Sequence, residues 1–411
     1  MVALLLNAAL GFGANPFKCI IKGDVIDRNS TALLLEKVSD SRAREPKQQI
    51  IPIHNHTFEF EFDLNETEAY ELIFKDEFDA GVYDAIVFFP ATGVINFKLY
   101  AQAKKDEVIG GELNNAYTAY KNSFDDTFQQ KRKLTSAVID SLNKVNGYYS
   151  PARDSIMNFI RGKSHADIDP LIWRRLTEMD KSGDALTLHG RLAKKAQDEL
   201  LADQKTWEYD YISKHINILS YYLMLHDALF GAKDNPVLLA DIKRAYPIFS
   251  TKYPTHSYTK LIGDLLTGFN KIIPGQKLID VNLPDLAGKT HHLNDLAKGK
   301  VTLIDFWGSW CGPCIAASRA MVPVYNEFKG KGFNVIGIAK EYKTTKSLKI
   351  ALNREKYPWI NLVELDDRNG VWNNYGITNS TGMMLLVDKD GKILAVDPTA
   401  EMVRQQLLAK L

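Results

Sequence analysis

The chain has 411 residues, a formal net charge of +1, 45% apolar residues and 25% charged residues. This length predicts two or three domains, and the composition is typical of a soluble globular protein. The near-zero charge gives no reason to expect nucleic acid or an anionic membrane as a partner. No apolar run reaches the ~20 residues that span a bilayer, and three cysteines exclude a disulfide-stapled scaffold.

The N-terminus predicts an export signal. Residues 1–14, MVALLLNAALGFGA, form an uncharged apolar run that ends in small residues. This resembles the apolar core and cleavage end of a secretory signal peptide. No Lys or Arg precedes the run, as would be expected if the signal were truncated. The alternative interpretation of residues 1–14 is a strand or helix packed on the following domain. We favour the signal peptide and expect export to the periplasm or cell envelope.

Residues 16–108 predict an all-β, sandwich-like domain. Apolar and acidic residues alternate strictly over Thr57–Leu64, which places the apolar side chains on one buried face and the acids in water. Cys19 is expected to be a buried thiol. Further short apolar runs suggest an antiparallel sandwich or a small barrel, and they cover residues 17–26, 31–38, 69–75, 83–89 and 94–99. We see no chemistry in this region, so its role stays open.

Residues 109–269 predict a helical region that acts as a spacer or docking body. Apolar residues from Ile212 to Phe230 step by 4, 3, 4 and 7, which is the spacing of one helical stripe. Aromatic residues here are interpreted as packing residues. Turn signals divide the region into several helices, at residues 149–151, 169–170, 182–183, 235–236 and 253–254.

Residues 273–411 alternate strands and helices, which predicts an α/β domain with parallel strands. Asp390-Gly391 supplies the turn of a terminal hairpin. The expected elements are a strand and loop (278–296), a strand (301–307), a helix (311–329), a strand (333–339), helices at 345–356 and 371–375, the hairpin (384–396) and a last helix from 399.

The segment Trp310-Cys311-Gly312-Pro313-Cys314 lies between a buried strand and a helix, where a Cys-x-x-Cys pair indicates a redox site. Residues three apart on a helix share a face, which suits a disulfide. The helix N-terminus favours a thiolate at Cys311. The alternative of a zinc site is disfavoured because Cys19 is the only other cysteine, so we predict no metal. The adjacent His291 and His292 are expected to be exposed to solvent.

The stretch IDFWGSWCGPC (304–314) resembles the active-site strand and helix start of thioredoxin. Together with the flanking PGQKLIDVNLPDLAGKTHHLNDLAKGKV and LLVDKDGKILAV, it resembles the TlpA-like thiol–disulfide oxidoreductases of bacterial envelopes. The resemblance covers roughly residues 273–411, and the arrangement behind a β-rich domain of unknown function is similar to that of multidomain envelope proteins. It implies that Cys311 attacks a disulfide and that Cys314 resolves the mixed disulfide, with no cofactor. Gly312-Pro313 favours reduction.

Three further candidates follow from the resemblance. Asp305 stands at the position of the buried acid of thioredoxin, where desolvation makes it a plausible base for Cys314; a structural acid is the alternative. Glu341 is a possible acid or base, with an exposed acid at a helix start as the alternative. Thr381-Gly382 occupies the place of the family's cis-proline, so substrate docking is in question. Pro323 falls one helical turn later than the family's helix-kinking proline.

The sequence therefore predicts an envelope protein-disulfide reductase that acts on a protein or small-molecule disulfide and is recycled by an unidentified electron donor. One alternative is a peroxiredoxin-like thiol peroxidase, which would require threonine at the position of Gly308. Another is a non-enzymatic docking module with a relaxed thioredoxin-like domain.

Overall fold

The computed structural model describes residues 16–39, 48–101, 106–162, 170–233, 235–377 and 382–411. The predicted signal peptide, residues 1–14, lies outside these residues. The chain forms two compact units, one of Thr118–His215 and the other of Met1–Tyr117 with Ile216–Leu411. The domain boundaries expected from the sequence stay a prediction. Among the described residues, no helix is both long enough and apolar enough to cross a membrane.

Two four-stranded sheets form the N-terminal part, in the orders β4-β1-β7-β8 and β3-β2-β5-β6. Both sheets contribute side chains to one apolar core, so the predicted β-sandwich architecture is confirmed. The elements are β1 (Phe17–Ile26), β2 (Ala32–Lys37), β3 (Gln49–Pro52), β4 (Thr57–Leu64), β5 (Tyr70–Phe74), α1 (Lys75–Ala80), β6 (Ile86–Phe88), β7 (Gly93–Tyr100) and β8 (Glu107–Ile109).

This sandwich differs from the expected antiparallel one at its centre. Strands β1 and β7 run parallel, from the pair Cys19–Gly93 to the pair Ile26–Tyr100. The alternation in β4 has the predicted effect, since Phe58 and Phe62 are buried, Phe60 is partly buried and the acids between them are exposed. The sequence did not predict β3 and β8, because strands of four and three residues carry too little periodicity.

The middle of the chain is helical, as predicted, and proline stands in the first turn of α3 and α7 where its missing N–H costs little. The predicted single stripe from Ile212 to Phe230 is wrong. Asn217 caps a new helix by accepting from the Ser220 N–H, so the stripe spans two helices and Phe230 is 58% exposed. The helices are α2 (Glu112–Lys144), α3 (Pro151–Ile160), α4 (Pro170–Ser182), α5 (Leu188–Lys214), α6 (Ile218–Phe230), α7 (Pro236–Lys252) and α8 (Ser257–Lys271).

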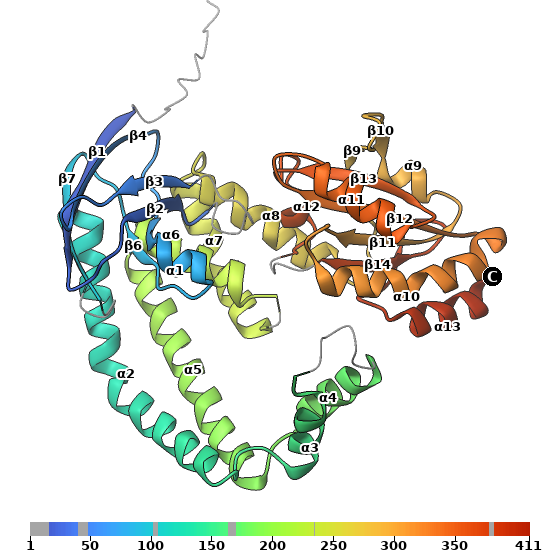
Figure 1. Cartoon of the computed structure of the whole chain (residues 1–411), viewed down its shortest axis with the longest axis horizontal. Coiled ribbons are helices and arrows are strands. Elements are labelled where there is room, and N and C mark those ends of the chain that lie inside the picture. The colour runs from blue at the N-terminus through green and yellow to red at the C-terminus, as the bar shows by residue number, and fades with distance from the viewer. Residues whose placement is uncertain (1–15, 40–47, 102–105, 163–169, 234, 378–381) are drawn as a thin grey trace, which may run out of the picture. The chain divides into compact units, whose positions relative to one another are not determined.

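The C-terminal domain has a five-stranded mixed sheet in the order β13-β12-β11-β14-β15, with a two-stranded β9–β10 hairpin before it. Every predicted element of the domain is present. Strand β13 is an addition, and residues 278–296, predicted as one strand and a loop, contain β9, β10 and most of α9. The elements, labelled in Figure 1 except for β15, are β9 (Asn282–Pro284), β10 (Thr290–His292), α9 (Leu293–Ala297), β11 (Val301–Trp307), α10 (Gly312–Phe328), β12 (Phe333–Glu341), α11 (Lys346–Glu355), β13 (Ile360–Leu365), α12 (Val371–Asn374), β14 (Met383–Val387), β15 (Ile393–Val396) and α13 (Ala400–Lys410).

Strand β11 is the centre of this domain, and all seven of its residues are buried. It pairs in parallel with β12 and antiparallel with β14, while helices cover both faces of the sheet. One face packs against α10, α11 and α13, and the other packs against α9 and α12. A strand that is covered on both faces has a nearly continuous run of apolar residues in its sequence. This is why the bounds of β11 were predictable.

Candidate active site

Cys311 and Cys314 form a disulfide at the N-terminus of α10, with their Cα atoms 5.3 Å apart. Cys311 is the residue before the helix, and its Sγ accepts from the Cys314 N–H at 3.3 Å. Pro313 lies in the first turn, where no partner for its nitrogen is needed. A thiolate at Cys311 would therefore face an N–H donor and the positive end of the helix dipole.

Asp305 lies on β11 beneath this helix and is 1% exposed. Burial raises the pKa of its carboxyl to about 7, although a hydrogen bond from Ser318 acts in the opposite direction. The Ser318 Oγ donates to Oδ2 of Asp305 at 2.6 Å. The residues opposite Asp305 in the sheet are the uncharged Gly337 and Met384. A carboxyl that titrates near neutral pH can take up and release a proton.

Glu341 ends β12 and is buried, with 2% of its surface exposed. Its carboxylate accepts from the Ser309 N–H at 2.7 Å and from the Ser309 hydroxyl at 2.8 Å. The alternative of an exposed acid at a helix start is therefore wrong. Both carboxylate oxygens of Glu341 bind the loop that leads into Trp310-Cys311. We therefore interpret Glu341 as a side chain that fixes the position of this loop.

Trp310 packs back against the end of the sheet, where its Nε1–H donates to the backbone oxygen of Lys340 at 2.9 Å. The close packing depends on Gly308. A Cβ at Gly308 would lie 2.5 Å from Nε1 of Trp310 and 3.0 Å from the Lys340 oxygen. A threonine at this position does not fit without moving the indole.

Gly382 forms the wall opposite the disulfide, and its N–H donates to Sγ of Cys314 at 3.2 Å. A Cβ here would lie 1.6 Å from the backbone oxygen of Phe306, so the approach requires glycine. Thr381, the other residue of the predicted pair, lies outside the described residues. Gly312, between the cysteines, has open space at its Cβ position.

The remaining candidates do not join this site. Cys19 is a buried thiol, as predicted, and burial raises its pKa. His291 is only partly exposed, contrary to expectation, because it pairs with Asp285 at 2.9 Å, whereas His292 is exposed. Pro323 lies inside α10. Within the residues that the structure describes, no cluster of three or more His, Cys, Asp or Glu side chains could hold a metal ion.

Two serines of the site escaped the sequence analysis. Ser309 follows the strand and binds Glu341, while Ser318 lies one helical turn after Cys314 and contacts Asp305. A signal for Ser318 was present, because the i+4 position after a buried Cys314 also points to the core, and a polar residue there is unusual. Ser309 carried no comparable signal, since its partner is 32 residues away.

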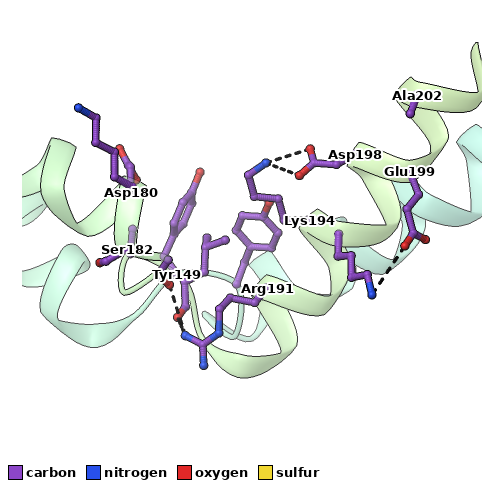
Figure 2. A pocket seen from close by; sticks show the side chains of 14 residues that line it. Tyr149, Asp180, Ser182, Arg191, Lys194, Asp198, Glu199 and Ala202 are labelled. Atoms are coloured by element: carbon purple, nitrogen blue, oxygen red, sulfur yellow. Dashed lines mark hydrogen bonds and ion pairs between the residues drawn. The ribbon is translucent and has the colours of Figure 1, made fainter. Parts of the chain in front are cut away.

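A second concave feature lies within the helical unit, at the turn between α4 and α5 (Figure 2). This open groove has a volume of about 770 Å³, and two lysines of its lining are paired with carboxylates on the same helix. Lys194 pairs with Asp198 at 2.6 Å, and Arg191 donates to the backbone oxygens of Gly183 and Leu186. These contacts do not indicate which class of ligand the groove would bind, so the groove is not assigned a role.

A mixed sheet with a Cys-x-x-Cys disulfide at the N-terminus of a helix defines a thioredoxin-like domain of the thiol–disulfide exchange class. Residues 274–396 match the AhpC/TSA family. The thiol-disulfide oxidoreductase ResA of Bacillus anthracis is 32% identical over 122 residues, which cover 29% of this chain and 66% of that protein. The ResA of Bacillus cereus is 30% identical over 135 residues, which cover 32% of this chain and 73% of that protein.

Among solved structures, the thioredoxin domain of a thiol-disulfide oxidoreductase from Bacteroides vulgatus is 29% identical and has a TM-score of 0.31. The alignment covers 33% of this chain and 96% of that one. Because the ResA of Bacillus cereus is 30% identical and 73% of its length is covered, the chain belongs, through its C-terminal domain, to the ResA-like family of thiol–disulfide oxidoreductases. This confirms the resemblance inferred from the sequence. The chain spans 66% of the length of the first relatives, just under two thirds. The family match, residues 274–396, includes none of the N-terminal sandwich.

Proposed function

We propose that this protein is an exported disulfide reductase that acts through a dithiol–disulfide cycle of Cys311 and Cys314. The observation that carries the proposal is the disulfide at the start of α10, with a buried carboxyl on the strand beneath it. The family membership supports thiol–disulfide exchange. The direction of reduction and the export to the periplasm or envelope are parts of the proposal that rest on the Gly312-Pro313 dipeptide and on residues 1–14.

In the proposed cycle, the Cys311 thiolate attacks a substrate disulfide, and one substrate sulfur leaves as a thiolate. Asp305, as a carboxylate, takes the proton of the Cys314 thiol. The Cys314 thiolate then attacks Sγ of Cys311, which breaks the mixed disulfide and releases the second substrate sulfur. The enzyme has lost two electrons to the substrate, and a dithiol donor restores it by the reverse exchange.

The direction follows from the stability of the Cys311–Cys314 disulfide relative to its dithiol. A Gly-Pro pair between the cysteines is that of thioredoxin, whose potential is ~−270 mV, whereas the strong oxidant DsbA is at ~−120 mV. The difference of ~150 mV corresponds to about 7 kcal/mol for two electrons. A potential near the lower value would make the dithiol a reductant for most protein disulfides.

Reduction of insulin by the dithiol form tests this proposal, with Cys311→Ser as the inactive control and Cys19→Ser as the active one. We expect Cys314→Ser to retain mixed disulfides with target proteins, because the resolving thiol is absent. Cys311→Ser should retain none. Absence of both reduction and trapped partners would instead favour the docking alternative, in which the domain binds without turnover.

The thiol peroxidase alternative receives no support from the site. It requires a threonine at position 308, and the indole of Trp310 occupies the space that its side chain would need. Turnover of hydrogen peroxide by the dithiol form at a rate above that of insulin reduction would nevertheless favour it, so both assays are made on the same preparation.

A further inference from the structure

Ser318 is a buried hydroxyl that the proposed cycle does not use. It lies on α10, four residues after Cys314, and is completely buried. Its Oγ lies 2.6 Å from Oδ2 of Asp305 and 2.9 Å from the backbone oxygen of Cys314. One side chain therefore contacts both the candidate base and the residue whose thiol that base would deprotonate.

The two contacts compete for a single hydrogen. A serine hydroxyl has one donor and two acceptor sites, while a carboxylate and a carbonyl both accept. When Asp305 is ionised, the Ser318 hydroxyl can donate to the carboxylate. When Asp305 is protonated, its own O–H can donate to Ser318, whose hydrogen is then available for the Cys314 carbonyl. The same hydroxyl thus satisfies Asp305 before and after it takes up a proton, with no other side chain moving.

Few other groups act on Asp305. From β12 and β14 the residues opposite it are Gly337 and Met384, which do not titrate. From α10 it contacts Ser318. Among the described residues, the titratable group that interacts with its charge from outside the helix is Tyr357, whose pKa is raised mainly by burial and also by Glu355 and Asp305. A side-chain hydrogen bond with Ser318 and the charge of Arg319 lower the pKa of Tyr357, so the Tyr357 hydroxyl is a further partner of Ser318. Tyr357 donates to the backbone oxygen of Ile315 at 3.2 Å.

We propose that Ser318 is a positioning residue for thiol–disulfide exchange, which orients the Asp305 carboxyl toward Cys314 and stabilises it in both protonation states. The inference rests on the proposed role of Asp305 as the base for Cys314. It does not make Ser318 a catalytic residue, because the hydroxyl touches the carboxyl and a backbone oxygen and not the reacting sulfur atoms.

The first consequence concerns the ionisation of Asp305. Ser318→Ala removes a donor to the charged form of a buried carboxyl, so the pKa of Asp305 should rise by about one unit. At any given pH this makes the ratio of ionised to protonated carboxyl about tenfold smaller. Ser318→Thr keeps the hydroxyl and should restore the titration.

The experiment measures two quantities in the full chain. The titration of the Asp305 carboxyl is followed by carbon-13 NMR in the disulfide form, and the rate at which the mixed disulfide is resolved is followed between pH 5 and 9. For Ser318→Ala we expect both midpoints to move to higher pH, and for Ser318→Thr we expect values near the wild type. Ser141→Ala is the matched control, because Ser141 makes the same hydroxyl contact to the carbonyl four residues earlier, on an exposed helix surface with no carboxyl in that contact.

A variant of Asp305 distinguishes the proposed role of Ser318 from the proposed reductase function. In an Asp305→Asn background, Ser318→Ala should produce no further shift in the pH profile. An unchanged Asp305 titration in Ser318→Ala would overturn the inference, and so would an equal shift in the Asp305→Asn background. If the wild type reduces no disulfide, the proposed function fails, while the NMR titration still decides the role of Ser318.

Discussion

The backbone N–H of Gly382 donates a hydrogen bond to Sγ of Cys314 over 3.2 Å, although the two residues are 68 positions apart. The contact places a backbone amide against Sγ of Cys314, the resolving sulfur of the proposed cycle. At the same point the backbone oxygen of Phe306 would lie 1.6 Å from a Cβ of residue 382. Glycine is therefore required by the close approach of two strands beside the disulfide, and not by a turn.

The first prediction is that Gly382→Ala displaces the start of β14 and weakens the contact to Cys314. Because the added methyl group overlaps backbone rather than a flexible side chain, we expect a loss of about 1–3 kcal/mol in the free energy of unfolding. The rate of insulin reduction should fall as well. Gly330→Ala is the control, since a Cβ at Gly330 meets no atom within 4 Å. Equal stability of the two variants in urea would show that the backbone at residue 382 can move to accommodate the methyl group, and would contradict the prediction.

The second prediction concerns the pH dependence of stability. Burial raises the pKa of Asp305 to about 7, above its value of ~3.9 in an unfolded chain. The folded state therefore binds this proton more tightly, and the contribution of Asp305 to stability is present below pH ~4 and lost as the pH rises through about 7.

Asp305→Asn removes the ionisation and keeps an oxygen that can accept from Ser318. We expect this variant to gain stability over the wild type at pH 8, and to gain much less at pH 5. Urea unfolding of the disulfide forms at both pH values measures the difference. The exposed Asp295→Asn serves as the comparison, and the prediction fails if the gain for Asp305→Asn is the same at both pH values.

The third prediction concerns Glu341 as the support of the loop before Cys311. In Glu341→Gln, the amide oxygen can still accept from the Ser309 N–H, but the N–H₂ group can only donate to the Ser309 hydroxyl, so both contacts lose a charged acceptor. We expect a loss of about 1.5–3 kcal/mol in the free energy of unfolding, as for hydrogen bonds to charged groups. The exposed Glu401→Gln should change stability by less than ~0.5 kcal/mol. If Glu341 acted only as an acid or base, the variant would lose activity and keep its stability.

The fourth prediction addresses the peroxidase alternative through Gly308→Thr. The new side chain would displace the Trp310 indole, whose Nε1–H would lose its partner at Lys340. We expect a change in tryptophan fluorescence and lower insulin reduction, with no gain in peroxide turnover. A gain in peroxide turnover with an unchanged fluorescence spectrum would show that the position does accept the peroxidase residue.

The fold of the C-terminal domain was predictable where burial is continuous, and less so where polar residues enter the sheet. Strand β11 has the bounds that its seven-residue run predicted despite Thr302 and Asp305, whereas the six-residue β13 escaped prediction because Asn361 and Glu364 leave only two adjacent apolar residues between them. Both are buried, and Asn361 is satisfied by the Nε1–H of Trp307 at 2.9 Å. A polar residue in a buried strand is explained only by a partner that lies far away in the sequence.

The same physical distinction divides the site. The sequence by itself determined the cysteine pair, its place between a buried strand and a helix, and the anomalous acid Asp305, because each of these depends on local spacing and on one-dimensional patterns of burial. Only the tertiary structure decided that Glu341 holds Ser309, that Ser318 contacts Asp305 and that Gly382 faces Cys314. Those relationships join separate elements, and the packing of the sheet against α10 brings them together.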